Sequence, residues 1–539
     1  MRAKASIIFL LLLFVSFQVS SGDRNQTRIN RNVSLMDGSN VSFVPYNIAP
    51  QSIVFTAPLA QGFATDSILV GPEVFTGISG FYDFKTNGET NEYIQVDALN
   101  PLNIHVIDVQ ADSLDQAGAT TRRTKYSFST DGGLTWELSV DVPNVRSGFG
   151  VLQLKDGAAV ISNHSTNAGN RLDANLYIDV APLAATFNEY SHPNPSTRPF
   201  GIWPQISVYN NGNVGLISRR NVSSTVPPET LYYSVYTGGT QMSDRTPLWI
   251  SGMNFIGTVG SNARYHIANN NQGRVTVIIA PVNENDTLEN SKIFEITSTN
   301  NGTTWGPVNT AFAPYTVNGG QDTVATAGGS FFKKKKNTNN WYLAYPVTTD
   351  NLFANGKLQL TKSDGSHTTI CTVADVGGAT TMSQSLAFVF TIDFPALGWS
   401  ADGSTLYCVY SVVKSDTSNG GFNQRDLYIQ YSLNDGTTWS TPVRLTNTPT
   451  IDETYPSVSL WNPGTSSGNY ELNLVYMKDP GVGPASFNGN GTLAAPSRNQ
   501  LIFRKLTGTN PIGIGNNQNI LKDYHLAQNF PNPFNPVTK

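Results

Sequence analysis

The chain is poor in charge and nearly free of cysteine. Charged residues make up 13% of its 539 residues, against roughly 25% in an average soluble protein, and Asn, Thr, Ser and Gly are abundant instead. The formal net charge is −4. The basic run "KKKK" at 333–336 sits beside "NTNN", which predicts a polar turn. Nucleic-acid binding requires a clustered basic surface, so the sequence predicts no nucleic-acid partner.

Motifs for metal and cofactor chemistry are missing as well. The six histidines show no H-E-x-x-H spacing, and there is no G-x-S-x-G elbow or Walker loop. The two cysteines, Cys371 and Cys408, cannot form a structural zinc site. They form either one disulfide or two buried free thiols. We therefore expect no metal and no cofactor. The loop "NENDTLEN" at 283–290 offers oxygen ligands for calcium, with an ordinary solvated turn as the alternative.

The ends of the chain indicate export. Residues 1–22 carry two basic residues, an apolar run and then small residues, which is typical of a secretory signal peptide. No other segment is apolar enough to span a bilayer, so we expect no transmembrane segment. The last 14 residues, "LAQNFPNPFNPVTK", resemble the opening of the C-terminal sorting module of type IX secretion substrates in Gram-negative bacteria. The resemblance implies a secreted or cell-surface protein whose partners include that machinery, with 509–539 as a linker and a truncated sorting tail.

Between the ends, one pattern recurs seven times. An apolar stretch is followed by a turn rich in Asn, Asp, Gly or Pro and then by a second apolar stretch, which predicts a β-hairpin. The turns recur at intervals of 55 to 66 residues. The residues that mark them are Pro101, Asp156, Asn211, Asn271, Lys336, Asp402 and Thr465.

A second motif lies 28 to 32 residues after four of these turns. It has the form S-x-D-x-G-x-T-W, in which Ser and Asp accept hydrogen bonds from the turn's own N–H groups and Gly supplies positive φ. The segment "LTKSDGSHT" around Asp364 is a degenerate copy. The three full copies comprise Ser129, Asp131, Gly133, Thr135 and Trp136; Ser298, Asn300, Gly302, Thr304 and Trp305; and Ser432, Asn434, Gly436, Thr438 and Trp439.

Each module therefore consists of an inner hairpin followed by an outer hairpin. Four antiparallel strands repeated radially form a β-propeller, so we predict an all-β fold of seven four-stranded blades, with six blades as the alternative. Residues 81–508 form the propeller, and 23–80 supply a strand segment that closes it. The motif resembles the Asp box, or BNR repeat, of the sialidase superfamily. That resemblance implies that the boxes lie at the outer edge and have a structural role, far from the axis where substrate binds.

Function is expected on the loops that lead into the inner hairpins, because scaffold loops carry binding residues while strands supply rigidity. These loops hold a large share of the aromatic and charged residues in a charge-poor chain. The alternative is that their aromatic side chains are wedged between blades and their carboxylates cap turns. The candidate ligand-binding residues are Tyr93, Arg146, Trp203, Gln205, Arg264, Tyr265, His266 and Tyr455.

The sialidase resemblance also implies an arginine triad, a Tyr nucleophile activated by Glu, and an Asp acid. Arg264, Arg146 and Arg198 supply candidate arginines, Glu453 and Tyr455 a candidate pair, and Asp322 or Asp393 a candidate acid. The Arg-Ile-Pro motif that opens the sialidase domain is absent between Gly22 and Glu92, however. The sequence therefore favours binding of a glycan or another extracellular polymer at the central mouth. A divergent sialidase-like exo-glycosidase and a structural, protein-binding propeller remain as alternatives.

Overall fold

The computed structural model describes most of residues 68–509, together with two short strands, β1 (Asn32–Ser34) and β2 (Asn40–Ser42). The gaps within 68–509 are 87–91, 114–119, 167–171, 194–199, 221–229, 251–263, 281–292, 313–315, 318–319, 322, 325–330, 335–337, 349–355, 381–390, 418–420, 464–468 and 487–493. The predicted signal peptide, sorting tail and calcium loop, and Arg198 and Asp322, lie outside the described residues.

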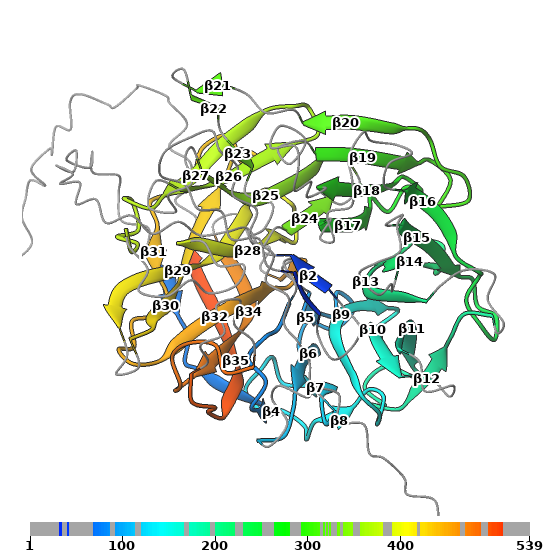
Figure 1. Ribbon diagram of the computed structural model, residues 1–539, viewed down its shortest axis with the longest axis horizontal. Coiled ribbons are helices and arrows are strands. Elements are labelled where there is room, and N and C mark those ends of the chain that lie inside the picture. The colour runs from blue at the N-terminus through cyan, green and yellow to red at the C-terminus, as the bar shows by residue number, and fades with distance from the viewer. Residues whose placement is uncertain are drawn as a thin grey trace, which may run out of the picture.

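Seven antiparallel sheets are arranged in a ring around a central axis (Figure 1). The first four blades run from the axis outward as β5 (Ile94–Val96), β6 (Ile104–Gln110), β7 (Arg123–Ser129) and β8 (Val140–Asp141); β9 (Ser147–Lys155), β10 (Ala158–Thr166), β11 (Leu172–Asp179) and β12 (Phe187–Tyr190); β13 (Gly201–Val208), β14 (Val214–Arg220), β15 (Thr230–Tyr236) and β16 (Thr246–Ile250); and β17 (Arg264–Asn269), β18 (Val275–Ala280), β19 (Ile293–Ser298) and β20 (Val308–Phe312).

The remaining blades follow the same plan with small additions. The fifth contains β24 (Phe331–Lys334), β25 (Trp341–Thr348), β26 (Lys357–Lys362) and β27 (His367–Thr372), and the short β23 (Thr323–Val324) also pairs with β25. The sixth contains β28 (Ile392–Ser400), β29 (Leu406–Thr417), β30 (Asn423–Ser432) and β31 (Val443–Arg444), with β33 (Trp461–Asn462) parallel to β28. The hairpin β21 (Thr316–Val317) and β22 (Gly320–Gln321) lies outside the seven sheets.

The seventh blade joins the two ends of the propeller sequence. Its inner strands are β32 (Asp452–Val458), β34 (Asn469–Asp479) and β35 (Asn499–Thr509). Its outer edge is supplied by β3 (Ile68–Val70) and β4 (Val74–Gly80), which both pair with β35, as the adjacent blue and red strands in Figure 1 show. The ring is therefore closed by strand pairing between segments more than 400 residues apart, such as Gly80 with Asn499 and Ile68 with Gly508.

The core lies between blades. Each sheet is covered on both faces by its neighbours, so strands such as β28 and β6 are buried along their whole length. One cluster joins Ile94 and Ile104 of the first blade to Leu152 and Ile161 of the second. The prediction of an all-β propeller of seven four-stranded blades is confirmed, and the six-blade alternative is wrong.

Two smaller expectations have mixed outcomes. Lys333 and Lys334 do not lie in a turn, because they pair with Tyr342 and Trp341 as the end of β24. Cys371 and Cys408 are both buried free thiols. Burial raises the pKa of the Cys371 thiol to about 12 and that of Cys408 well above its ordinary value.

The three box segments connect the third and fourth strands of the first, fourth and sixth blades. Asp131 Oδ1 accepts hydrogen bonds from the N–H groups of Leu134 (3.0 Å) and Thr135 (2.9 Å), and the Thr135 hydroxyl donates to Oδ2 (2.6 Å). Ser129 Oγ accepts from Gly133 N–H (2.8 Å). The Thr135 and Ser129 hydrogen bonds hold the pKa of Asp131 at about 2. In this box the carboxylate is a turn-forming group.

The two Asn copies keep this geometry with one hydrogen bond reversed. Asn300 Oδ1 accepts from Thr304 N–H, and Asn300 Nδ2 donates to Thr304 Oγ1, both at 2.9 Å. Asn434 and Thr438 repeat the arrangement at the same distances. A threonine hydroxyl both donates and accepts, so either Asp or Asn completes the turn.

Candidate functional site

The ring has two ends, which we name by their loops. The mouth face is the end at which the innermost strand of each blade begins, and the turn face is the opposite end, where each innermost strand turns into the second strand. The boxes lie at the turn face, because Gly132 N–H donates to Leu102 O and Asn301 N–H to Gly273 O, each joining a box to the hairpin turn of its own blade. The predicted binding residues lie toward the mouth face.

Four innermost strands carry the same β-bulge near the mouth face. At each bulge an aromatic residue has left-handed φ, 53° at Phe149, 50° at Trp203, 50° at Phe394 and 52° at Tyr455, and the strand register shifts there. Such φ values are unusual for bulky residues. The next residue is Gly or Pro in every case, and Pro has no N–H to donate to the sheet. The bulges thus re-aim four aromatic side chains at equivalent positions.

These four residues, which we call the bulge aromatics, contact arginine side chains or one another. The guanidinium carbon lies 4.8 Å from the ring centroid for Arg122 over Phe149 and for Arg219 over Trp203, and 5.7 Å for Arg425 over Tyr455. Such cation–π contacts contribute about 0.5–2 kcal/mol each. Across the two neighbouring blades, the rings of Phe394 and Tyr455 are 4.5 Å apart. Tyr455 is partly exposed, whereas Phe149, Trp203 and Phe394 are buried.

A cluster of buried charges adjoins Tyr455. Both Arg425 side-chain nitrogens Nε and Nη2 donate to the carboxylate of Asp452. Asp479 stands opposite Asp452 across β32 and β34, and burial raises the pKa of Asp479 to about 7. Lys85 and Asp108 form a second ion pair of 2.9 Å in which both side chains are 1% exposed. Carboxyl groups with strongly perturbed pKa values are enriched at functional sites, although ion-pair networks produce them too.

The candidate ligand-binding residues are mostly buried and hydrogen-bonded within the fold. Tyr93 OH donates to Lys85 O (2.6 Å), and Tyr265 OH donates to Trp203 O (2.7 Å). Gln205 and His266 are also buried, whereas Arg146 and Tyr455 are partly exposed. Arg264 is the first residue of β17, and its side chain lies outside the described residues. Of the described set, Arg146 and Tyr455 are therefore the most accessible.

The catalytic candidates are not arranged as a Tyr/Glu nucleophile pair. Glu453 Oε1 lies 4.0 Å from Lys478 Nζ and accepts from Thr448, while Tyr455 contacts Phe394 and Arg425. Burial raises the pKa of Tyr455, which opposes formation of a phenolate, and raises that of Glu453 to about 7. Asp393 is buried, and its Oδ1 accepts from Phe394 N–H.

A Ser-His-Asp constellation between the second and third blades has the wrong proton arrangement for catalysis. His192 Nε2 lies 2.8 Å from Ser234 Oγ, and Nδ1 lies 3.9 Å from Asp173. Arg245 Nη2 lies 3.0 Å from His192 Nδ1, and because arginine is always a donor, Nδ1 accepts and Nε2 carries the proton. Burial lowers the pKa of His192 to about 3. A base for Ser234 requires an unprotonated Nε2, so this cluster is structural.

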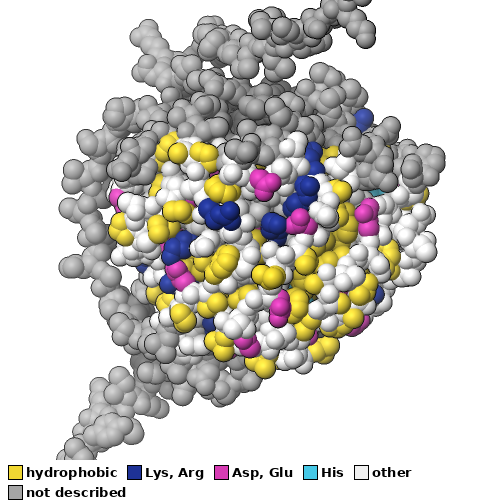
Figure 2. All heavy atoms as spheres, turned by 90° about the horizontal axis from the view of Figure 1, so that it is seen from below, with side chains coloured by type: hydrophobic (Ala, Val, Ile, Leu, Met, Phe, Trp, Pro, Cys, Tyr) yellow, Lys and Arg dark blue, Asp and Glu magenta, His cyan; other side chains and the backbone are white. Residues whose placement is uncertain are grey.

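Within the described part of the chain, no three His, Cys, Asp or Glu residues approach closely enough to hold a metal ion. The same part contains no helix with the length and apolarity needed to cross a membrane. On the side of the propeller shown in Figure 2, basic and acidic side chains are interspersed among uncharged ones.

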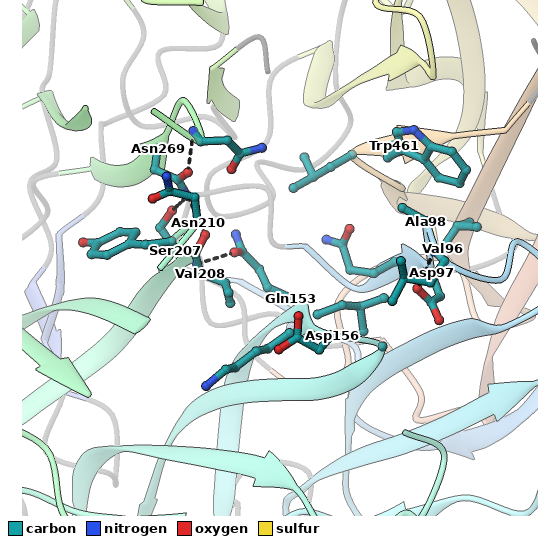
Figure 3. A pocket seen from close by; sticks show the side chains of 18 of the residues that line it. Val96, Asp97, Ala98, Gln153, Asp156, Ser207, Val208, Asn210, Asn269 and Trp461 are labelled. Atoms are coloured by element: carbon teal, nitrogen blue, oxygen red, sulfur yellow. Dashed lines mark hydrogen bonds between the residues drawn. The ribbon is translucent and has the colours of Figure 1, made fainter. Parts of the chain in front are cut away.

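The sequence reasoning missed two features. One is the bulge pattern, whose signal is an aromatic residue followed by Pro or Gly near the start of an inner strand. The other is a cavity of about 1050 Å³ at the turn face (Figure 3). Its walls are the ends of the innermost strands and the hairpin turns of six blades, which include Gln153, Asn269 and Trp461. The sequence analysis used these turns only to mark the repeat.

No protein-family model and no curated protein matches the chain. Among solved structures, an ulvan lyase from a new family of polysaccharide lyase, bound to -[GlcA(1-4)Rha3S]-, is similar with 8% identity and a TM-score of 0.48, over 79% of this chain and 95% of that chain. An α-L-arabinofuranosidase from Fusarium graminearum has 11% identity and a TM-score of 0.37, over 80% and 97%. A Trypanosoma rangeli sialidase has 10% identity and a TM-score of 0.36, over 81% and 59%. By their names, all three act on glycans.

Proposed function

We propose that this protein is a secreted propeller that binds an extracellular glycan on the axis at the mouth face. The observation that carries the proposal is the set of bulge aromatics, which four blades present at equivalent positions around one end of the ring. Sugar rings have apolar faces and polar edges, so they are recognised by aromatic surfaces beside a few fixed polar groups. Tyr455 supplies such a surface, with Arg425 and Asp452 beside it.

Trp203 adds a polar group without a partner. Its side chain is 7% exposed, and its indole N–H has no hydrogen-bond acceptor among the described residues. A buried unsatisfied donor costs about 1–3 kcal/mol, and ligand or water is the usual explanation for one. In the proposed complex, a sugar hydroxyl or carboxylate accepts this hydrogen bond.

The proposal also includes secretion of the protein. Residues 1–22 have the features of a signal peptide, and the tail at 526–539 resembles a type IX sorting module. We propose that the type IX machinery delivers the protein to the cell surface of a Gram-negative bacterium. The Asp-box reading is supported by the turn hydrogen bonds of Asp131, Asn300 and Asn434.

A second function, cleavage of the bound glycan, is favoured by Asp479. A carboxyl group with a pKa of about 7 is suited to general acid or base catalysis at neutral pH. The cluster of Asp479, Asp452, Arg425 and Tyr455 differs from the Tyr/Glu arrangement implied by the sialidase resemblance. Release of reducing ends without a new ultraviolet-absorbing double bond indicates hydrolysis, and release with such a double bond indicates elimination; both are measured on each bound glycan. Loss of either activity in Asp479→Asn, with binding retained, supports catalysis.

The test of the binding proposal is a glycan array followed by calorimetric titration of each hit. Tyr455→Ala is expected to weaken binding at least about tenfold, as truncation of an aromatic anchor does. Phe128→Ala, a change in β7 away from the mouth, serves as the control. Absence of any saturable glycan binding removes glycan binding at the mouth face from consideration and leaves the structural, protein-binding role. Equal binding by Tyr455→Ala and the parent protein also removes the mouth face and assigns the bound glycan to another surface.

A further inference from the structure

We propose a second binding site, for a neutral oligosaccharide, in the cavity at the turn face. It lies at the opposite end of the axis from the mouth face, and the bulge aromatics do not line it. Its volume of about 1050 Å³ slightly exceeds the roughly 300–1,000 Å³ of small-molecule sites. The cavity is therefore large enough for several linked sugar units rather than a single one.

The lining has the composition of a sugar site. The indole of Trp461 provides a flat apolar surface and is partly exposed. Trp461 and Asp97 lie on one side of the opening and Asn210, Asn269 and Ser207 on the other, facing each other across it (Figure 3). Pyranose rings stack through their C–H faces on an indole while amides, hydroxyls and carboxylates bind the ring hydroxyls. Both kinds of contact are present here within one concave surface.

The polar groups at the rim are fixed before any ligand arrives. In four blades, a side-chain oxygen accepts from the N–H two residues ahead: Asp97 from Leu99 (2.9 Å), Asn211 from Asn213 (3.1 Å), Asn269 from Asn271 (2.8 Å) and Asp402 from Ser404 (3.0 Å). These Asx turns hold each side chain in one orientation, which reduces the entropy lost on binding. Among the described residues, the hydrogen bonds to Asp97 and Asp402 use Oδ1 of each carboxylate and leave Oδ2 without a partner.

The charge of the lining selects the class of sugar. Among the described residues that line the cavity, the charged side chains are three carboxylates, Asp97, Asp156 and Asp402, and one cation, Lys155. A site with this excess of negative charge repels uronic acids, sialic acids and sulfated sugars. A neutral oligosaccharide, whose hydroxyl groups donate to carboxylates and amides, fits the lining without that repulsion. The two ends of the axis therefore have different chemistry.

The test is calorimetric titration, at pH 7, with cellotetraose, maltotetraose, xylotetraose and mannotetraose, and with tetragalacturonate as the acidic probe. Ala98 lines the cavity and is exposed, so Ala98→Arg obstructs the site without entering the core. Leu134 is 73% exposed on the first box and does not line the cavity, so Leu134→Arg is the matched control. Trp461→Ala removes the stacking surface, and Tyr455→Ala tests the mouth face in parallel.

At least one neutral tetrasaccharide is expected to bind, with affinity reduced at least about tenfold by Ala98→Arg and Trp461→Ala and unchanged by Leu134→Arg and Tyr455→Ala. If Trp461→Ala does not fold, the oligosaccharide affinity of Ala98→Arg alone tests the site. The site is overturned if no neutral tetrasaccharide binds, if Ala98→Arg leaves binding unchanged, or if tetragalacturonate alone binds. Binding that is lost in Tyr455→Ala and kept in Ala98→Arg overturns it while supporting the mouth face.

Discussion

Asp452 and Asp479 stand directly opposite each other on the paired strands β32 and β34. Like charges at opposite positions destabilise a sheet. The two carboxyl groups, however, have different partners. Asp452 is paired with Arg425. Asp479 accepts hydrogen bonds from Gly481 N–H and from the Ser497 hydroxyl, and burial raises its pKa to about 7. Asp452 is thus ion-paired, whereas burial favours the protonated form of Asp479.

The raised pKa of Asp479 makes stability depend on pH. Because the folded-state pKa lies above the unfolded value, its protonation stabilises the fold fully below about pH 4, and this contribution is lost as the pH rises toward 7. A shift from 3.8 to about 7 corresponds to on the order of 4 kcal/mol. Asp479→Asn, which keeps the acceptor for Gly481, is expected to be more stable than the parent at pH 8, with a smaller difference at pH 5. Urea denaturation at both pH values measures this, and an equal difference at both contradicts it.

The Arg425–Asp452 ion pair is expected to be strongly coupled, since both residues are buried. Arg425→Met leaves a buried carboxylate without its cation, which costs about 3–5 kcal/mol. Replacing both, as Arg425→Met with Asp452→Asn, is expected to cost less than the sum of the single changes. A double-mutant cycle in urea measures the coupling. Additive effects within about 0.5 kcal/mol would show that the two side chains act independently.

The first box is expected to accept Asn but not Ala. Asp131→Asn should be nearly neutral, because Asn300 and Asn434 already complete the same turn. Asp131→Ala removes the acceptor of four hydrogen bonds at the turn and is expected to lower the free energy of unfolding by about 1–2 kcal/mol. Glycan binding should be unchanged in both variants. A loss of binding in Asp131→Asn, without a loss of stability, would assign the carboxylate a role in function.

The two thiols are expected to be inert in the folded protein. Cys371 and Cys408 are 2% and 0% exposed, and the raised pKa of about 12 for Cys371 leaves almost no thiolate at pH 8. Ellman's reagent should detect neither thiol in native protein and both in denaturant. Leu134→Cys, at an exposed turn position, is the positive control. Rapid reaction of a native thiol would contradict the buried placement.

The fold was predictable from the sequence because its repeat is local. Each hairpin and each box is a short segment that can be recognised from its turn residues and its apolar strands. The regular spacing of these segments along the sequence therefore indicated the blades and their number. The candidate site was less predictable. The pairing of Asp452 with Arg425 and its position opposite Asp479 depend on strand register between segments 27 residues apart, and no local pattern reports that. The burial of each aromatic residue could not be predicted either. Tyr93, Tyr265 and Tyr455 all lie at or near the start of innermost strands, yet Tyr93 and Tyr265 are buried and hydrogen-bonded within the fold.

The central claim is that a glycan binds at the mouth face against Tyr455. A crystal structure of the protein in complex with the tightest glycan from the array tests it most directly. We expect density for a sugar ring within about 4 Å of the Tyr455 ring, with a sugar oxygen accepting the hydrogen bond from Trp203 Nε1. A mouth face without sugar in a crystal soaked at saturating concentration, or sugar confined to the turn face, would contradict the claim.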